Sequence, residues 1–228
     1  MLPRLENPEI VFSLCSPIGT ENKKVSELLA AGLCAYGYGA TQFKVTELMK
    51  GIVIPGYDLP QEPTEKRYDA FIKYANKLRE LYADNSVLAM MCCAAIRAER
   101  TKKTGKPNSY ITQHAYIFDQ FKRKEEVEAL RQVYGRLFIA VSIFSDRKNR
   151  IMKLSHKIAQ DHASARSGTQ HSIAEKLIAQ DENEEDEPYG QRLRDVFPTA
   201  DIFIDIDDEE QTSRQISRFL KGLFGATG

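Results

Sequence analysis

Five short apolar runs alternate with longer amphipathic stretches along the chain. The runs are rich in branched and aromatic side chains and cover residues 10–14, 40–45, 115–119, 137–144 and 200–206. Because these runs are mostly continuous rather than alternating, they predict strands that are covered on both faces, as in a parallel sheet.

Helical periodicity separates the apolar runs. One-face spacing follows the first run at Val25, Leu28, Leu29 and Leu33, and a similar stripe lies near the end at Ile216, Phe219, Leu220, Leu223 and Phe224. Strands alternating with helices imply right-handed crossovers. The pattern therefore predicts an α/β fold: a three-layer, doubly wound, five-stranded parallel sheet in a single domain over residues 1–228.

Two longer segments interrupt the alternation. About residues 51–110 contain a proline-punctuated loop and then helical patterns at about 64–83 and 85–103, of which the second is so apolar that we expect it to be buried. About residues 146–198 carry two polar helical patterns and an acidic run at 181–187, which we expect to be solvated. The sequence thus predicts a helical insertion and a lid-like polar insertion.

Composition narrows the function classes. Basic and acidic residues balance at 32 each, so no overall field attracts nucleic acid or an anionic membrane. No apolar stretch reaches the length of about 18 residues that a membrane span needs. The four cysteines show no C-x-x-C spacing and predict reduced, buried thiols in a cytoplasmic protein.

The segment "SPIGTENKKV" follows the first apolar run and leads into a helical pattern. A strand, a tight turn and a helix start form a common phosphate site, because the N–H groups of the turn and the helix dipole both favour an anion. The phosphate-loop consensus is G-x-x-x-x-G-K-[ST]. Here Ser16 replaces the first glycine, Glu21 the second and Asn22 the lysine, whereas Gly19 keeps a loop role.

Loss of the lysine removes a contact to the β- and γ-phosphates, and Lys23 at the hydroxyl position removes a Mg²⁺ ligand. Lys23 or Lys24 can replace part of the charge, and Thr20 offers a hydroxyl one position away. Glu21 would repel phosphate. Three interpretations stay open: a loop that only links strand to helix, a phosphate or nucleotide site without efficient catalysis, and an active phosphoryl-transfer site.

Asp119 ends the third run, at the edge where doubly wound sheets bind ligands, and Lys122 and Arg123 follow it. In the P-loop nucleoside monophosphate kinases, which the layout of this chain resembles, an acidic residue here helps to hold Mg²⁺ and nearby basic residues position phosphate. The resemblance therefore implies that Asp119 is the candidate catalytic residue and Mg²⁺ ligand and that the two cations are candidate phosphate contacts. An acidic residue here also suits the cap of the following helix, and both roles are compatible.

Polar side chains also flank the lid-like insertion at Arg147, Arg150, Gln191 and Arg194. Arginines neutralise transferring phosphates through bidentate contacts, which makes these residues candidate nucleotide contacts. The alternative is that they are ordinary surface arginines.

The whole layout resembles the P-loop nucleoside monophosphate kinases, in which the first insertion caps the monophosphate and the second covers the donor phosphates. This resemblance implies a nucleoside triphosphate and Mg²⁺ as cofactors. Four stretches are similar to the kinase-like N-terminal domain of bacterial anti-phage deoxycytidylate deaminases: "SPIGTE", "AYIFDQFKRKEEVEALRQVYG", "GQRLRDVF" with "ADIFIDI" close behind, and "QISRFLKGLFG".

In those deaminases the kinase-like domain precedes a zinc-dependent domain that converts deoxycytidine nucleotides to deoxyuridine nucleotides. The pattern H-x-E with a later P-C-x-x-C is absent from this chain, so we expect neither a deaminase domain nor zinc here. The resemblance implies a degenerate nucleotide-binding, regulatory domain of an antiviral system, partnered by a fused or separate deaminase domain, by further copies of itself and by an inhibitory small RNA. The alternative is an active deoxynucleoside monophosphate kinase.

Overall fold

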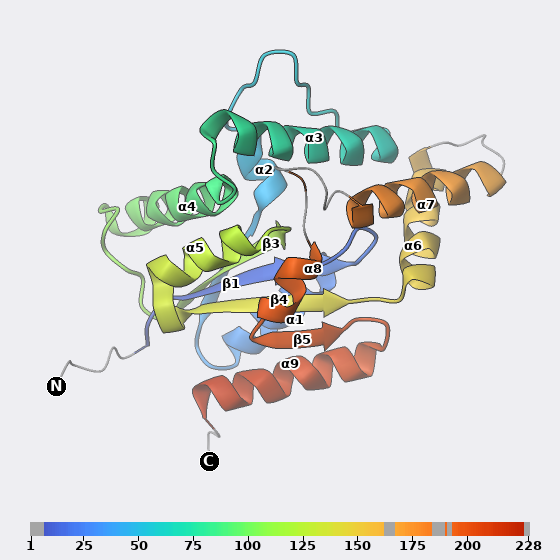
Figure 1. The fold of residues 1–228 in the computed structure, drawn as a ribbon. Helices are drawn as coiled ribbons and strands as arrows, with labels where there is room; N and C mark the ends of the chain where they lie inside the picture. The colour runs from blue at the N-terminus through green and yellow to red at the C-terminus, as the bar shows by residue number, and fades with distance from the viewer. Residues whose placement is uncertain (1–6, 162–166, 184–189, 191–192, 226–228) are drawn as a thin grey trace.

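The computed structural model describes residues 7–161, 167–183, 190 and 193–225. A central sheet lies between two layers of helices, and further helices cover the end of the sheet where the strands finish (Figure 1). The strands are β1 (Ile10–Cys15), β2 (Gly39–Lys44), β3 (His114–Phe121), β4 (Phe138–Phe144) and β5 (Ile202–Asp205).

All neighbouring strands of the sheet are parallel, in the order β2-β3-β1-β4-β5. The predicted doubly wound, five-stranded parallel sheet is therefore confirmed. Because the strands are parallel, their carboxyl ends share one edge, and the register places Lys44 of β2 directly beside Asp119 of β3.

Successive side chains of each strand point to opposite faces and divide the core in two. In β1, Val11 and Cys15 enter the cluster on one face, whereas Phe12 and Leu14 enter the cluster on the other. Helices α1 (Asn22–Cys34) and α9 (Glu209–Phe224) pack together on the second face. The first face is covered by α2 (Val45–Met49), α4 (Val87–Thr104), α5 (Lys124–Tyr134) and α8 (Leu193–Val196).

The segment between β2 and β3 holds α2, the loop with the prolines, α3 (Thr64–Tyr82) and α4. The residues that follow α3 and α4, Ala83 and Gly105, both adopt the left-handed conformation that commonly terminates helices. Burial of α4 is one-sided: Cys92 and Ile96 are fully buried, but Met90 is 40% exposed. The expectation that this helix is buried is therefore confirmed for one face and wrong for the other, because only one face packs into the core.

The segment between β4 and β5 holds α6 (Arg147–Asp161), α7 (Ser167–Asn183), α8 and two short connections. Helices α6 and α7 lie at the carboxyl edge of the sheet (Figure 1). They form a third, smaller apolar cluster with Ile18 of the loop after β1 and Ile72 of α3. This cluster fixes both helices directly over the loop.

Two other expectations from the sequence need correction. Strand β2 is an edge strand whose residues are exposed or half-buried, so it is not covered on both faces. Cys34 is exposed at the end of α1, whereas Cys15 and Cys92 are buried as expected. Among the described residues, no helix is long and apolar enough to cross a membrane.

Candidate functional site

The loop between β1 and α1 turns tightly at Gly19. Its φ of +87° lies in the left-handed region, and a Cβ atom there would approach the backbone oxygen of Arg150 to 2.8 Å. The N–H of Thr20 donates to the carbonyl of Pro17 at 3.3 Å. The glycine is thus required both by its backbone conformation and by the close approach of α6.

Asn22, at the position of the consensus lysine, is tied to the end of β3. Its Nδ2 donates to Oδ1 of Asp119 at 2.6 Å, and the asparagine is 4% exposed. Among the described residues, Asn22 Oδ1 and the hydroxyl of Thr20 are buried oxygens without a hydrogen-bond partner. Two predicted site residues thus meet at one point, with two oxygen atoms free to accept a donor or a cation.

Lys23 and Lys24 project from the first turn of α1 into ion pairs near the surface. The Nζ atom of Lys23 lies 3.5 Å from Glu27, and that of Lys24 lies 2.9 Å from Glu209. Exposed pairs of this kind contribute little to stability. Both ammonium groups can therefore exchange their partner for a ligand at small cost.

Lys122 binds a carboxylate of the chain itself. Its Nζ donates to Oδ1 and Oδ2 of Asp181 at 3.0 and 3.1 Å, and the N–H of Ile18 donates to Oδ2 at 2.7 Å. Asp181 is 2% exposed, so the expectation that this acidic run is solvated is wrong at its first residue. Ser16, which precedes the turn, is also buried.

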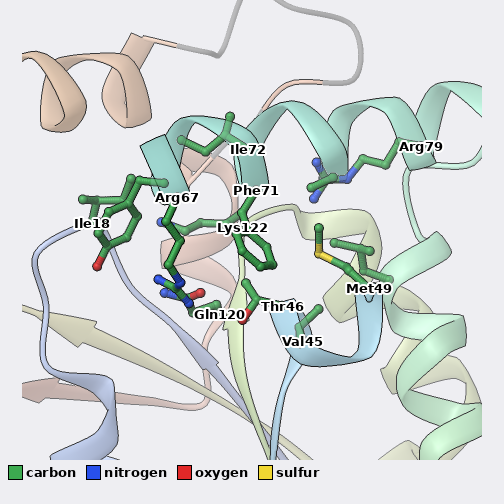
Figure 2. A pocket seen from close by; sticks show the side chains of 13 residues that line it. Ile18, Val45, Thr46, Met49, Arg67, Phe71, Ile72, Arg79, Gln120 and Lys122 are labelled. Atoms are coloured by element: carbon green, nitrogen blue, oxygen red, sulfur yellow. The ribbon is translucent and has the colours of Figure 1, made fainter. Parts of the chain in front are cut away.

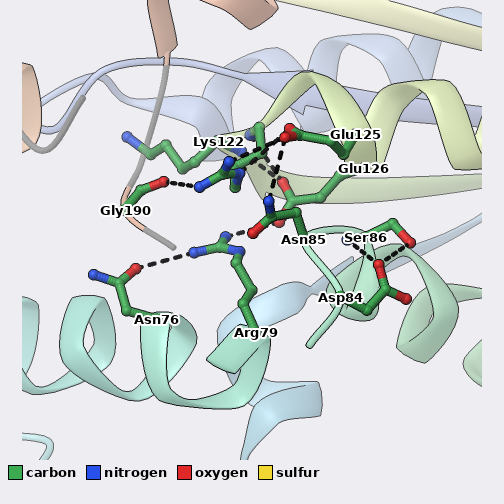
Figure 3. A network of polar contacts seen from close by, with 10 residues as sticks. Asn76, Arg79, Asp84, Asn85, Ser86, Lys122, Glu125, Glu126 and Gly190 are labelled. Atoms are coloured by element: carbon green, nitrogen blue, oxygen red, sulfur yellow. Dashed lines mark hydrogen bonds and ion pairs between the residues drawn. The ribbon is translucent and has the colours of Figure 1, made fainter. Parts of the chain in front are cut away.

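Arg123 belongs to a buried polar network that joins α3, α5 and Gly190. Figure 3 shows Arg79, Glu126 and Gly190 of this network. Its Nη1 donates to the carbonyl of Gly190 and its Nη2 to Glu125 at 3.0 Å. Beside it, Arg79 of α3 donates to Oε1 of Glu126 at 2.7 Å. The other oxygen of Glu126 accepts the backbone N–H groups of Lys122 and Arg123. In this structure the Arg123 guanidinium positions the chain around the site.

Two candidate arginines of the second insertion, Arg147 and Arg150, contact Glu182 at the end of α7. Arg150 donates to the carbonyl of Ile18 at 3.3 Å and to Glu182 at 2.8 Å, and Arg147 donates to Glu182 at 3.4 Å. Arg194 is exposed and borders a separate hollow of about 360 Å³. Gln191 lies outside the described residues.

A cleft of about 690 Å³ opens at the carboxyl edge, between the loop, α3 and α6. Of the predicted residues it is lined by Gly19, Thr20, Asn22, Lys23, Lys24 and Asp119. It also has lining residues that the sequence interpretation missed: Lys44, Arg67, Tyr68, Lys153 and Lys157. The cleft thus unites part of the predicted phosphate loop with a new group of cations.

Lys44, Arg67 and Lys157 concentrate positive charge around the ring of Tyr68. The Arg67 guanidinium carbon and the Lys157 Nζ each lie 5.7 Å from the ring centroid. Partial desolvation and the positive charges of Arg67 and Lys44 lower the pKa of Lys157, although Asp161 opposes this shift. Cations that repel one another in a cleft favour an anionic ligand, because the ligand relieves the repulsion.

A small apolar recess of about 50 Å³ adjoins the cleft and shares Arg67, Tyr68 and Gln120 with it (Figure 2). Its apolar side is built by α2 and α3, with Val45, Met49, Phe71 and Ile72 among the lining residues. Gln120 has a φ of +78°, and the pairing of β1 with β3 passes over it, from Asp119 to Phe121. This bulge at the strand end turns Gln120 to the site, as bulges beside functional sites often do.

One missed residue had a signal in the sequence. Lys44 ends the predicted second strand, and the carboxyl end of a parallel strand is where ligands bind. Arg67 and Lys157 have no such signal in the sequence, because their position in the cleft depends on how α3 and α6 cross above the sheet. Among the described residues, no group of three or more His, Cys, Asp or Glu side chains is arranged to hold a metal ion.

The Asp119 carboxyl is buried, which disfavours its ionised form. Burial raises its pKa, whereas the hydrogen bond from Asn22 and the charges of Lys44 and Lys122 act in the opposite direction. A raised pKa in the folded state means that ionised Asp119 lowers stability at pH values above that pKa, and that this cost disappears as the pH falls below the unfolded pKa.

Asp119→Asn is therefore expected to raise the free energy of unfolding near neutral pH, by about 1 kcal/mol, the scale typical of single substitutions. The gain should shrink toward pH 3, where the wild-type carboxyl is protonated in both states. Urea unfolding across this pH range measures it. A gain that is independent of pH, or a loss at neutral pH, would contradict the assigned charge state.

The chain was compared with known proteins and structures. No protein-family model matches it, and no curated protein sequence matches it significantly. An uncharacterized protein from Eubacterium ventriosum ATCC 27560 is 14% identical with a TM-score of 0.47, over 93% of this chain and 98% of the other. A gluconokinase from Sinorhizobium meliloti 1021 is 10% identical with a TM-score of 0.40, over 98% and 100%.

A shikimate kinase from Bacteroides thetaiotaomicron is 8% identical with a TM-score of 0.44, and the match covers 94% of this chain and 98% of the other. Likenesses at these identities and TM-scores say nothing about substrate or activity. The strand order, the loop after the central strand β1 and the two helical insertions define where the cleft lies in the fold. The function therefore has to be inferred from the cleft.

Proposed function

We propose that the chain is a kinase-like binding domain that holds an anionic small molecule of the nucleotide class in the cleft without efficient phosphoryl transfer. One observation carries this proposal. The position of the phosphate-bridging lysine is occupied by Asn22, which is bonded to Asp119, while Lys44, Arg67 and Lys157 converge on the same cleft. The site has kept its affinity for anions and lost the group that stabilises a transferring phosphoryl.

Mg²⁺ is compatible with this cleft as a companion of ligand phosphates. Asp119 and the unpartnered oxygens of Asn22 and Thr20 are hard oxygen donors, and all three residues line the cleft. One carboxylate is too little for an all-protein cage, so the ligand's own phosphate oxygens would supply the remaining contacts. Bound there, the ion would neutralise phosphate charge beside Asp119.

We further propose that the domain regulates an anti-phage deoxycytidylate deaminase that acts on the deoxynucleotide pool. This step is supported by the four similar sequence stretches alone, and the same stretches imply the deaminase domain, further copies of the chain and a small RNA as partners. The natural gene tests it: H-x-E with a later P-C-x-x-C is expected downstream or in a neighbouring gene. Absence of that pattern from both places would contradict the link.

Calorimetric titration with ATP, dCTP, dCMP and dTTP tests binding in the cleft. At least one nucleotide is expected to bind with micromolar affinity, typical of a preformed site, and to lose affinity as salt rises because the cations are partly exposed. A coupled assay of ADP release, with each monophosphate as acceptor, should detect no turnover. Failure of all four nucleotides to bind would refute the proposal.

A further inference from the structure

The donors that a phosphate loop would offer to a ligand are already used by a carboxylate from α7. Asp181 accepts the N–H of Ile18 and both contacts from the Lys122 ammonium, and it is excluded from solvent. A backbone N–H from the turn plus one lysine is the donor set that binds phosphate oxygens. A carboxylate meets the same donors, because both groups are acceptor-only anions.

Helix α6 makes a second set of contacts to the loop, at Ile18 and Gly19. Arg150 of α6 joins the carbonyl of Ile18 to Glu182, and its own backbone packs on Gly19. The loop is therefore held by α6 at its glycine and by α7 at its amide. Neither Asp181 nor Lys122 lines the cleft, but Ile18 and Lys122 line the small recess that adjoins it, so this anion site is a neighbour of the cleft.

The packing that holds α7 in place is small. Ala174, Leu177 and Ile178 belong to the cluster with Ile18 and α6, which is distinct from the two clusters on the sheet faces. Elements with few buried apolar contacts are those that open without unfolding the remainder. Detaching the end of α7 consequently leaves both faces of the sheet covered.

We propose that Asp181 is a built-in competitor for phosphate, which occupies the loop until a phosphate-bearing ligand displaces it. Docking of the α7 end and binding of a phosphate by Ile18 and Lys122 exclude each other, because both need the same N–H and ammonium groups. The tethered carboxylate is present at high effective concentration, which lowers the affinity of the loop for every free phosphate ligand by the same factor. A ligand that displaces Asp181 releases the end of α7. Ligand binding at the loop thereby changes the surface that α7 presents.

Pyrophosphate is the probe, and the amide resonance of Ile18 in ¹⁵N spectra is the readout. Asp181→Ala is expected to bind pyrophosphate at Ile18 about tenfold more tightly than the wild type, because a charge-assisted competitor is gone. Glu175→Gln removes the same charge from an exposed position of the same helix and should leave the affinity unchanged. Adding Lys122→Met to Asp181→Ala should abolish the gain.

Hydrogen exchange of the wild-type protein keeps the proposal testable if Asp181→Ala does not fold. Rising pyrophosphate should accelerate exchange in the last turn of α7 while protection in β1 and β4 stays constant. Asp181→Asn offers a further fold-preserving variant with an intermediate gain. Equal affinities of wild type and variants, or a shift of the Ile18 amide with α7 protection unchanged, would overturn the proposal. Lys44→Gln should not alter this result, because Lys44 lines the cleft but not the recess that contains Ile18 and Lys122, and this separates the test from the proposed function of the cleft.

Discussion

Arg79→Met is expected to lower the free energy of unfolding by about 3–5 kcal/mol, the cost of leaving a buried charge without its partner. Arg79 is 1% exposed, and its guanidinium lies 2.7 Å from Oε1 of Glu126, which is fully buried. Methionine keeps most of the side-chain volume, so the loss reports the charge rather than a cavity. Urea unfolding at neutral pH measures the change.

Lys73→Met is the matched control, because Lys73 pairs with Asp69 on the exposed side of the same helix. Its effect should stay below about 1 kcal/mol. Adding Glu126→Gln to Arg79→Met should recover part of the loss, since the stranded carboxylate is then neutral. Equal effects of Arg79→Met and Lys73→Met would show that the network in Figure 3 does not hold α3 to the start of α5.

The double substitution Lys44→Gln and Arg67→Gln is expected to weaken nucleotide binding by about a hundredfold, because each removes one charge-assisted contact from a partly desolvated cleft. Glutamine is shorter than both side chains but stays polar and carries no charge. The fold should be unaffected, since neither cation takes part in a salt bridge with a buried carboxylate among the described pairs. Calorimetric titration of the tightest nucleotide measures the loss.

Lys221→Gln, on the exposed face of α9 and remote from the cleft, changes the charge without touching the site and should bind as the wild type does. The double variant should also show a weaker dependence of affinity on salt, because fewer charges contribute. Undiminished binding by the double variant would place the anion elsewhere and refute the cleft as the nucleotide site.

The sheet could be predicted from the sequence because a strand that is buried on both faces consists of a continuous run of apolar residues. The continuous apolar runs of β1, β3 and β4 mark each end of their strands to within two residues. Strand β2 was found despite its exposure, since Thr41 and Phe43 keep strand-like side chains next to two glycines. The buried faces of helices such as α9 can be predicted equally well, because the 3.6-residue period is a local property of the sequence.

The candidate site was less predictable because it depends on how distant elements meet. The bond between Asn22 and Asp119 joins residues that are adjacent only through the pairing of β1 with β3. The acidic run that includes Asp181 looks solvated in the sequence, and nothing local reveals that its first residue faces Ile18 and Lys122. Buried charged residues show no periodicity along the sequence, so the residues that pair with them can be identified only in the tertiary structure.

Phosphorus NMR of the protein mixed with Mg²⁺-ATP and a deoxynucleoside monophosphate tests the central claim, binding without transfer, in one experiment. The account predicts that resonances of at least one nucleotide broaden or shift on addition of protein, whereas no ADP and no nucleoside diphosphate form over hours. Broadening should vanish in the Lys44→Gln and Arg67→Gln variant. Steady formation of ADP together with the matching diphosphate, abolished by Lys24→Ala or Asp119→Asn, would contradict the account and identify a working kinase.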